Sequence, residues 1–243
     1  MAYCEYVIQH DVNFCVASGE IFVIMGDSGS GKSTLLRHLI GLQIPAGGKV
    51  HYGDVSFWDL SEEERRRYSK QFGVLYQSGA LWSSMSLAEN IGLPLREHTD
   101  YSEERIRETT AFKLSLVGLA GFDDFYPAEI SGGMRKRAGL ARAMALDPDI
   151  LFFDEPSAGL DPISSKRLDE LILDIRDSLG TTVVVVTHEL ASIFTIADNA
   201  VFLDGEARAQ TALGDPRTLR THPPSAKVGE FLSRGGGIVE TQP

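Results

Sequence analysis

A glycine-rich stretch stands directly between an apolar run and a helical pattern near the N-terminus. The apolar run is Ile21 to Met25, and its lack of alternation is typical of a strand buried on both faces. The stretch Gly26 to Thr34 reads GDSGSGKST and fits the pattern G-x-x-x-x-G-K-[ST]. Apolar residues then recur at helical spacing at Leu35, Leu36, Leu39 and Ile40. Strand, glycine loop and helix in this order predict a phosphate-binding unit in an α/β fold.

The residues of this loop are suited to holding ATP. Glycines let backbone N–H groups turn toward phosphates, and the helix N-terminus adds the positive end of its dipole. We expect Lys32 to reach the β- and γ-phosphates and the Ser33 hydroxyl to ligate Mg²⁺. The expected ATP-binding residues of the loop are Gly26, Asp27, Ser28, Gly29, Ser30, Gly31, Lys32, Ser33 and Thr34.

A pair of carboxylates follows a second apolar strand. Asp154 and Glu155 come directly after Ile150 to Phe153, where a magnesium-dependent phosphate site needs acidic groups. We expect Asp154 to hold Mg²⁺ and Glu155 to orient and deprotonate the attacking water. Together with Lys32, this predicts an ATPase.

Three further features narrow the class of nucleotide-binding protein. Gln77 and His188 each end an apolar strand, at the edge of a parallel sheet where ligands bind. Either residue alone is more often structural. Ser131-Gly132-Gly133 begins a helical segment and offers a second anion-binding N-terminus. Because one loop suffices for one ATP, this second site suggests contact with another subunit's nucleotide.

Composition excludes several other classes. The 243 residues carry 23 Lys plus Arg against 34 Asp plus Glu, a net charge of −11, which disfavours nucleic acid as a partner. Two cysteines give no disulfide framework. No apolar run reaches the roughly 18 residues of a membrane helix, and no signal peptide is evident. We therefore expect a cytosolic protein.

The remaining pattern predicts one domain with subdomains. Residues 47–60 suggest short strands, Ser61 to Arg67 starts a helix, and 164–179 predicts the helix of a βαβ crossover that ends at the strand Val183 to Val186. Residues 1–78 and 147–214 form the expected core. Residues 79–146 form a helical subdomain with expected breaks at Pro94, Gly118–Gly121 and Pro127. Residues 215–243 form a C-terminal extension whose end, at Gly235–Gly237, we expect to fray.

In order along the chain, these elements resemble the nucleotide-binding subunit of ABC transporters over nearly its whole length. Gly26–Thr34 resembles the Walker A loop, Gln77 the Q-loop and Ser131–Gly133 the signature. Asp154–Glu155 resembles Walker B with the catalytic glutamate, Ser157–Asp161 the D-loop, and His188 the switch histidine. The resemblance implies a P-loop core with a mainly parallel sheet, a small antiparallel β subdomain and a helical subdomain.

The resemblance also implies roles that depend on a homodimer. Two subunits pair head to tail, so Ser131, Gly132, Gly133 and Asp161 would bind the partner's ATP. The implied catalytic residues are Glu155, His188 and Lys32. The implied magnesium ligands are Ser33, Gln77 and Asp154.

Two departures from the family pattern stand out. The signature here is Ile130-Ser131-Gly132-Gly133-Met134 instead of Leu-Ser-Gly-Gly-Gln, and its phosphate-facing Ser-Gly-Gly is retained. The family usually has a strand ahead of the aromatic residue that stacks on adenine. Here Tyr3 stands about where that aromatic belongs, just after the start of the chain, with Tyr6 as the competing choice.

A narrower resemblance points to the Mla/Mce-type branch of these transporters. It rests on Gln77 to Trp82, on Pro94 to His98, and on Gly132 to Ala143. It implies phospholipid movement across the bacterial envelope, with permease subunits, a lipid-binding Mce-type partner and a place on the cytoplasmic face of the inner membrane. The apolar residues after Gln77 suit either a permease groove or simple core packing: Leu81, Trp82 and Met85.

Two other functions stay open at this point. One is a soluble ABC ATPase without a permease, of the iron–sulfur assembly type. The other is an ABC transporter ATPase for a different substrate. A catalytically dead regulatory cassette is disfavoured because this chain retains all the catalytic groups that such a cassette would lack: Lys32, Asp154, Glu155 and His188.

Overall fold

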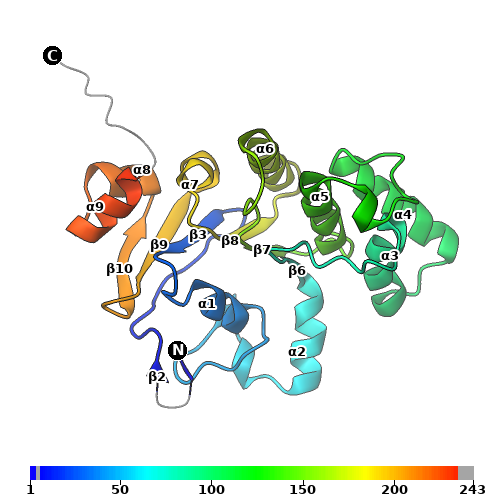
Figure 1. Cartoon of the computed structure of the whole chain (residues 1–243). Helices are drawn as coiled ribbons and strands as arrows, with labels where there is room; N and C mark the ends of the chain where they lie inside the picture. The colour runs from blue at the N-terminus through cyan, green and yellow to red at the C-terminus, as the bar shows by residue number, and fades with distance from the viewer. Residues whose placement is uncertain (4–5, 235–243) are drawn as a thin grey trace.

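The computed structural model describes residues 1–3 and 6–234, with a six-stranded sheet through its middle (Figure 1). The strand order is β10-β9-β3-β8-β7-β6. All neighbouring pairs are parallel except β10, which runs antiparallel to β9. This confirms the predicted α/β fold with a mainly parallel sheet. The strands are β3 (Ile21–Gly26), β6 (Phe72–Leu75), β7 (Ile150–Asp154), β8 (Thr182–Val186), β9 (Asn199–Asp204) and β10 (Ala209–Gly214).

The two faces of this sheet carry two separate cores. In β3, Ile21 and Val23 belong to the core that includes side chains of α5, α6 and α7, while Phe22 and Ile24 pack with α1. Side chains alternate across a strand, so one apolar run serves both faces. Figure 1 shows α1 below the sheet and α5, α6 and α7 above it. These helices are α1 (Lys32–Leu39), α5 (Gly132–Ala143), α6 (Pro162–Leu179) and α7 (Leu190–Ile196).

Short antiparallel pairs lie on the α1 side. β1 (Ala2–Tyr3) pairs with β2 (Tyr6–Val7), and β4 (His51–Tyr52) pairs with β5 (Val55–Ser56) around Gly53, as predicted for 47–60. The helix expected from Ser61 is α2 (Glu62–Tyr68). It opens with a reciprocal capping box between Ser61 and Glu64. Short 3₁₀ turns cover Phe57–Asp59 and Ser69–Gln71.

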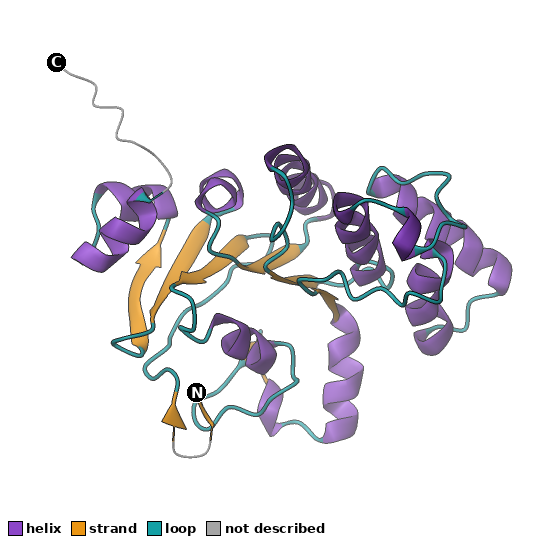
Figure 2. Ribbon diagram, in the orientation of Figure 1, coloured by secondary structure: helices purple, strands orange, loops and turns teal. Residues whose placement is uncertain are grey.

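The part between β6 and β7 is helical, as Figure 2 shows by the lack of strands there. It consists of α3 (Leu87–His98), α4 (Glu103–Leu116), a 3₁₀ turn (Pro127–Glu129) and α5. The predicted breaks at Gly118–Gly121 and Pro127 are found.

The predicted break at Pro94 is wrong, because Pro94 lies inside α3. Proline removes one backbone donor from the helix. The helix continues because a capping box between Ser86 and Glu89 fixes its start and because Ile91 and Leu95 are buried in the core.

The structure contains two helices after residue 215 that the sequence analysis did not predict. α8 (Pro216–Thr221) and α9 (Ala226–Ser233) are capped by Asp215 and Ser225, respectively. The apolar face of α9 is buried. Burial of this face stabilises the helical structure of the Pro-rich segment. The expected frayed end at Gly235–Gly237 lies outside the described residues. Over the described ranges, no helix is long and apolar enough to cross a membrane.

Candidate nucleotide site

The glycine loop turns sharply where β3 meets β9. Gly26 has φ 151°, and a Cβ atom there would lie 2.3 Å from the Leu203 carbonyl oxygen. Only glycine permits both this backbone conformation and this close approach. The loop then runs into α1, whose first helical residue is Lys32. The sequence therefore folds locally as the motif predicted, with backbone amides gathered at a helix N-terminus.

Lys32 points back into this loop. Its Nζ donates hydrogen bonds to the carbonyl oxygens of Gly26 at 3.0 Å and Asp27 at 2.8 Å. The side chain is buried, and this burial lowers the pKa of Lys32, although the carboxylates of Glu155, Asp27 and Asp154 oppose the shift. A buried cation whose hydrogen bonds in the described structure go to carbonyl groups is well placed to meet an anionic ligand.

Ser33 and Asp154 are hydrogen-bonded at the carboxyl end of β7. The Ser33 hydroxyl donates to Oδ1 of Asp154 at 3.1 Å, although 121 residues separate them in the chain. Ser33 comes from the first turn of α1 and Asp154 is the last residue of β7. The contact brings together two oxygen ligands of the kind that Mg²⁺ prefers.

Glu155 and His188 form the second pair at this edge. Nδ1 of His188 lies 2.8 Å from Oε1 of Glu155, and the Glu155 amide donates to the Val186 carbonyl at 2.8 Å. Glu155 has φ 49°, a left-handed conformation that is rare for a residue with a side chain. Such strain is common where a side chain must be aimed at a functional site. Oε2 of Glu155 is buried and has no hydrogen-bond partner among the described residues.

Gln77 lies further along the same edge. It follows β6, which neighbours β7, while His188 follows β8 on the other side of β7. Gln77 is exposed. The carboxyl ends of three adjacent parallel strands therefore present polar groups to one region, as ligand sites in such sheets do.

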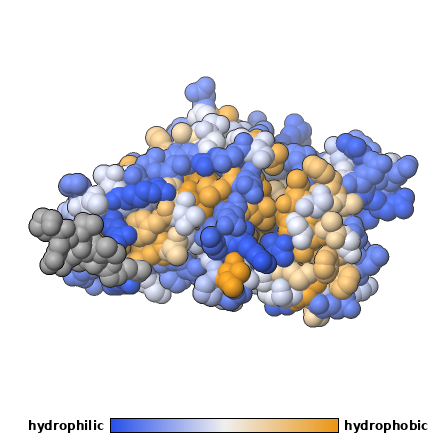
Figure 3. Space-filling model, turned by 90° about the horizontal axis from the view of Figure 1, so that it is seen from above, coloured by the Kyte–Doolittle hydropathy of each residue, from blue (hydrophilic) through white to orange (hydrophobic). Residues whose placement is uncertain are grey.

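The apolar residues after Gln77 differ in exposure, which bears on whether they pack in the core or contact a permease. Leu81 is half-buried and packs against the core, and Met85 is also half-buried. Trp82 is 59% exposed. Figure 3 shows one face of the molecule, on which apolar areas stand among polar ones. Core packing thus accounts for Leu81, while Trp82 remains available to a partner.

The signature residues lie apart from the loop of their own chain. Ser131 caps α5 by accepting a hydrogen bond from the Met134 amide at 3.2 Å, and α5 lies on the opposite face of the sheet from α1. Gly132 and Gly133 form the first turn of α5. Within the described structure, no hydrogen bond joins these three residues to the loop at Gly26–Thr34.

Asp161 caps α6 and is also outside the loop. Its carboxylate accepts hydrogen bonds from the Ile163 and Ser164 amides at 3.0 and 3.1 Å and from the Ser164 hydroxyl at 2.6 Å. The Ser164 hydrogen bonds lower the pKa of Asp161. Its geometry in one chain is that of a helix cap.

Of the two candidate adenine-stacking residues, the structure describes the side chain of one. Tyr6 is exposed, and the Arg208 guanidinium lies 4.6 Å from its ring centroid, within the range of a cation–π contact. The side chain of Tyr3 lies outside the described residues.

Two buried residues near the site were not singled out by sequence. Gln9 donates from Nε2 to the carbonyl oxygens of Ser30 and Asp204, both at 2.8 Å, and so ties the loop to β9. Lys136 of α5 donates to the Glu155 carbonyl at 3.3 Å, and burial lowers its pKa. Gln9 has no motif around it, and Lys136 belongs to an Arg-Lys-Arg run that resembles a solvated helix face.

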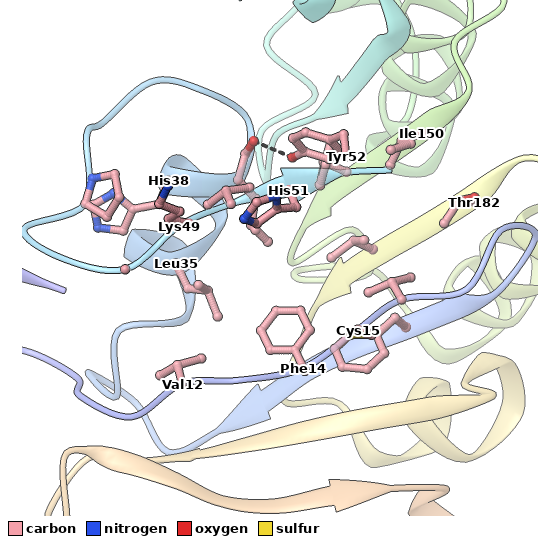
Figure 4. Close-up of a pocket in the computed structure, with 18 of the residues that line it drawn as sticks. Val12, Phe14, Cys15, Leu35, His38, Lys49, His51, Tyr52, Ile150 and Thr182 are labelled. Atoms are coloured by element: carbon pink, nitrogen blue, oxygen red, sulfur yellow. Dashed lines mark hydrogen bonds between the residues drawn. The ribbon is translucent and has the colours of Figure 1, made fainter. Parts of the chain in front are cut away.

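A cavity of the described structure lies at a different place. It measures about 1910 Å³ and lies on the α1 face of the sheet (Figure 4). Its lining includes Val12, Phe14, Leu35 and Tyr52, and the Tyr52 hydroxyl donates to the Leu39 carbonyl. None of Lys32, Ser33, Asp154, Glu155 or His188 lines it. The cavity is therefore separate from the nucleotide site.

The profile of the ABC transporter family matches residues 9–158, which is more than half of the chain. This chain belongs to the ABC transporter family. The match covers the glycine loop, the signature helix and the Asp154–Glu155 pair.

Several ABC relatives share 42% identity with the chain. One is the intermembrane phospholipid transport system ATP-binding protein MlaF of Escherichia coli K12, over 86% of this chain and 81% of that protein. MlaF of Haemophilus influenzae matches 82% of this chain and 75% of that protein. The "Probable ribonucleotide transport ATP-binding protein mkl" of Mycobacterium tuberculosis matches 93% of this chain. The chain spans 62% of the length of that mkl protein.

Solved ABC structures share the fold. The dimeric ATP-binding cassette MJ0796, in a post-hydrolysis state with ADP and Pi, gives a TM-score of 0.77 at 29% identity and covers 86% of this chain and 90% of its own. CbiO1 from Clostridium perfringens gives 0.78 at 23% identity, over 93% of this chain and 92% of its own. The second likeness concerns the fold alone.

Proposed function

We propose that this ABC protein binds and hydrolyses ATP to drive a membrane transporter of the Mla/Mce type. The observation that carries the proposal is the pairing of Ser33 with Asp154 and of Glu155 with His188 beside a glycine loop that holds Lys32. A phosphate cradle, an oxygen ligand pair and a positioned carboxylate are the groups that phosphoryl transfer to water requires.

The glycine loop is the proposed phosphate cradle. Backbone amides between Gly26 and Thr34 hold phosphate oxygens, and the Lys32 ammonium exchanges its carbonyl contacts for the β- and γ-phosphates. The hydroxyl of Ser33, the carboxylate of Asp154 and the side-chain oxygen of Gln77 hold Mg²⁺. All three are hard oxygen ligands, and the first two are already in contact. A Mg²⁺ ion held by these residues would neutralise charge on the phosphate during transfer.

Glu155 is the proposed general base. Its free, buried Oε2 can accept a proton from water, while Oε1 is held by His188. His188 is exposed at the strand end, where its other ring nitrogen is free to contact the γ-phosphate. Tyr3, or Tyr6 in its place, stacks on adenine in this proposal.

The proposed active form is a homodimer. Ser131, Gly132 and Gly133 begin α5 away from their own loop, so they are available to the ATP of a second subunit, together with Asp161. The dimeric MJ0796 cassette supports this arrangement.

The proposed cargo is phospholipid. The MlaF proteins are named for intermembrane phospholipid transport, and the chain covers 81% of the Escherichia coli protein. The mkl proteins are named for ribonucleotide transport, but the chain covers 62% of their representative from M. tuberculosis. The chain thus accounts for more of the length of MlaF than of mkl, which favours phospholipid. The proposed partners are permease subunits and a lipid-binding Mce-type protein, with this chain at the cytoplasmic face of the inner membrane.

Co-purification from detergent-solubilised membranes tests this proposal. The natively expressed protein is isolated, and mass spectrometry identifies the bound proteins and lipids. We expect a multi-spanning permease, a membrane-anchored lipid-binding protein and phospholipid. Recovery as a free species, or with iron–sulfur assembly proteins, would remove the transporter and leave the ATPase chemistry standing.

A further inference from the structure

The C-terminal helix α9 packs beside the glycine loop. Val228, Phe231 and Leu232 on its apolar face are buried. The Phe231 ring meets the Phe202 ring edge-on, with centroids 5.1 Å apart, and Phe202 of β9 is paired with Met25 at the end of β3. The helix is thus anchored directly behind the strand from which the loop emerges.

One cation on α9 joins this helix to three carboxylates. Nζ of Lys227 lies 2.6 Å from Asp204, 3.3 Å from Asp27 and 3.3 Å from Glu206. Asp27 is the second residue of the glycine loop, and Asp204 is the last residue of β9. Glu206 is 90% exposed, so solvent screens its share. Nη1 of Arg234 is a weaker, more distant partner of Asp27 at 3.9 Å.

These charges are partly shielded from water. The Lys227 and Asp27 side chains are each 26% exposed and Asp204 is 11% exposed. The hydrogen bond to Asp204 raises the pKa of Lys227. The same bond helps to lower the pKa of Asp204 against the opposing effect of burial. Lys227 is therefore a fixed positive charge between the loop and β9.

We propose that Lys227 is a positioning residue for ATP binding, which holds the Asp27 carboxylate against α9 and away from the phosphates. The inference rests on the proposed function, because it concerns how the same loop receives ATP. It makes the docking of α9 part of the nucleotide site, although α9 lies about 200 residues after the loop in the chain.

The physical reason is the sign of the charges. Without Lys227, the Asp27 carboxylate would keep only the more distant Arg234 among its described cationic partners, and Asp204 would keep the Glu206 and Ala207 amides. Both carboxylates would then carry less compensated negative charge beside the site for anionic phosphates. Asp27 already acts electrostatically on Lys32, whose ammonium contacts the Asp27 carbonyl. A released Asp27 carboxylate would compete with ATP for Lys32 and would repel the phosphates. Both effects weaken ATP binding without changing Glu155 or His188.

The test compares Lys227→Met with Lys227→Arg in the full chain. Equilibrium binding of Mg-ATP and steady-state hydrolysis are measured for both. Lys227→Met should raise the ATP Kd and KM about tenfold, as expected for the loss of one partly screened charge, and should leave kcat within about twofold. Lys227→Arg should restore both values. The control is Lys166→Met, which removes a surface pair with Glu170 on α6 and should change neither value.

A second substitution separates charge from mere anchoring. Adding Asp27→Asn to Lys227→Met removes the released carboxylate and should recover most of the lost affinity. Should Lys227→Met fail to fold, Lys227→Gln replaces it in the same comparison. An unchanged Kd and KM, or no recovery with Asp27→Asn, would overturn the inference. A wild-type protein that neither binds nor hydrolyses ATP would instead contradict the proposed function.

Discussion

Nδ1 of His188 lies 2.8 Å from Oε1 of Glu155, while Oε2 of the same carboxylate is buried without a hydrogen-bond partner in the described structure. The two oxygens of Glu155 are therefore in different situations. One is fixed by His188, and the other is buried with its hydrogen-bonding capacity unused in the described structure. In the proposed mechanism, His188 therefore positions Glu155, and Glu155 takes the proton from water.

Replacement of His188 by alanine should slow hydrolysis more than it weakens binding. Glu155 loses the contact that orients it, and a misplaced base costs roughly 10- to 100-fold in kcat. The ATP KM should rise by less than kcat falls, because the glycine loop and Lys32 keep their contacts with the phosphates. Phosphate release at saturating ATP measures the change. His98→Ala, at an exposed position on α3, should retain wild-type rates. A His188→Ala variant with normal kcat would remove this role.

Gly139→Ala should disturb the segment that carries Gln77. A Cβ atom at position 139 would lie 2.9 Å from the Gly79 carbonyl oxygen and 2.9 Å from Leu75. Such overpacking typically costs about 1–3 kcal/mol. Urea unfolding measures the loss, and the hydrolysis rate reports the shift of Gln77.

The control is Gly47→Ala, where no atom lies within 4 Å of the added Cβ and the backbone conformation is not strained. It should unfold at the wild-type urea concentration. Equal stability of the two variants would show that α5 and the Gly79 turn are not in close contact.

Asp169 should make stability depend on pH. Burial raises its pKa to about 6, against a hydrogen bond from Ser192 that lowers it. The folded protein then keeps this proton to a higher pH than the unfolded chain does. The free energy of unfolding should therefore fall as pH rises from about 4 to about 6 and lose nothing further from this group above that.

Asp169→Asn removes this contribution. Urea unfolding at about pH 5 and about pH 7.5 should show a larger gain over wild type at the higher pH. Asp174→Asn, at an exposed position on the same helix, should show no such difference. A gain for Asp169→Asn that is equal at both pH values would contradict a raised pKa.

Trp82→Ala should weaken assembly with the permease without lowering the rate of ATP hydrolysis. The side chain is 59% exposed, and the residue is fixed through its backbone amide, which donates to Asn90 at 2.7 Å. The fold and basal ATPase rate should survive, while recovery with a permease falls. Phe112→Ala on α4 is the matched control, because that side chain is 57% exposed elsewhere on the helical part. Unchanged permease recovery with Trp82→Ala would exclude Trp82 from the docking surface.

The nucleotide loop and the sheet edge were predictable from sequence because local chemistry dictates them. Gly26 to Thr34 needs glycines at fixed positions, and the apolar runs before Asp154 and His188 are buried parallel strands. Parallel pairing then brings their carboxyl ends together. The pairing of Glu155 with His188 follows from this topology.

Features that depend on tertiary packing could not be predicted in this way. Pro94 violates helix propensity, and burial of its neighbours outweighs that cost. Gln9 and Lys227 reach the loop from opposite ends of the chain, and neither stands in a pattern that indicates its partner. The sequence predicts the shape of the glycine loop better than it predicts what holds this loop in place.

Glu155→Gln tests the central claim most directly. Phosphate release from Mg-ATP by the purified variant is compared with wild type, and ATP binding is measured in parallel. Loss of a general base should lower the hydrolysis rate at least ~10²-fold, while the isosteric side chain leaves ATP binding intact. Near wild-type hydrolysis by Glu155→Gln, with ATP bound normally, would contradict the assignment of Glu155 as the base and with it the proposed mechanism.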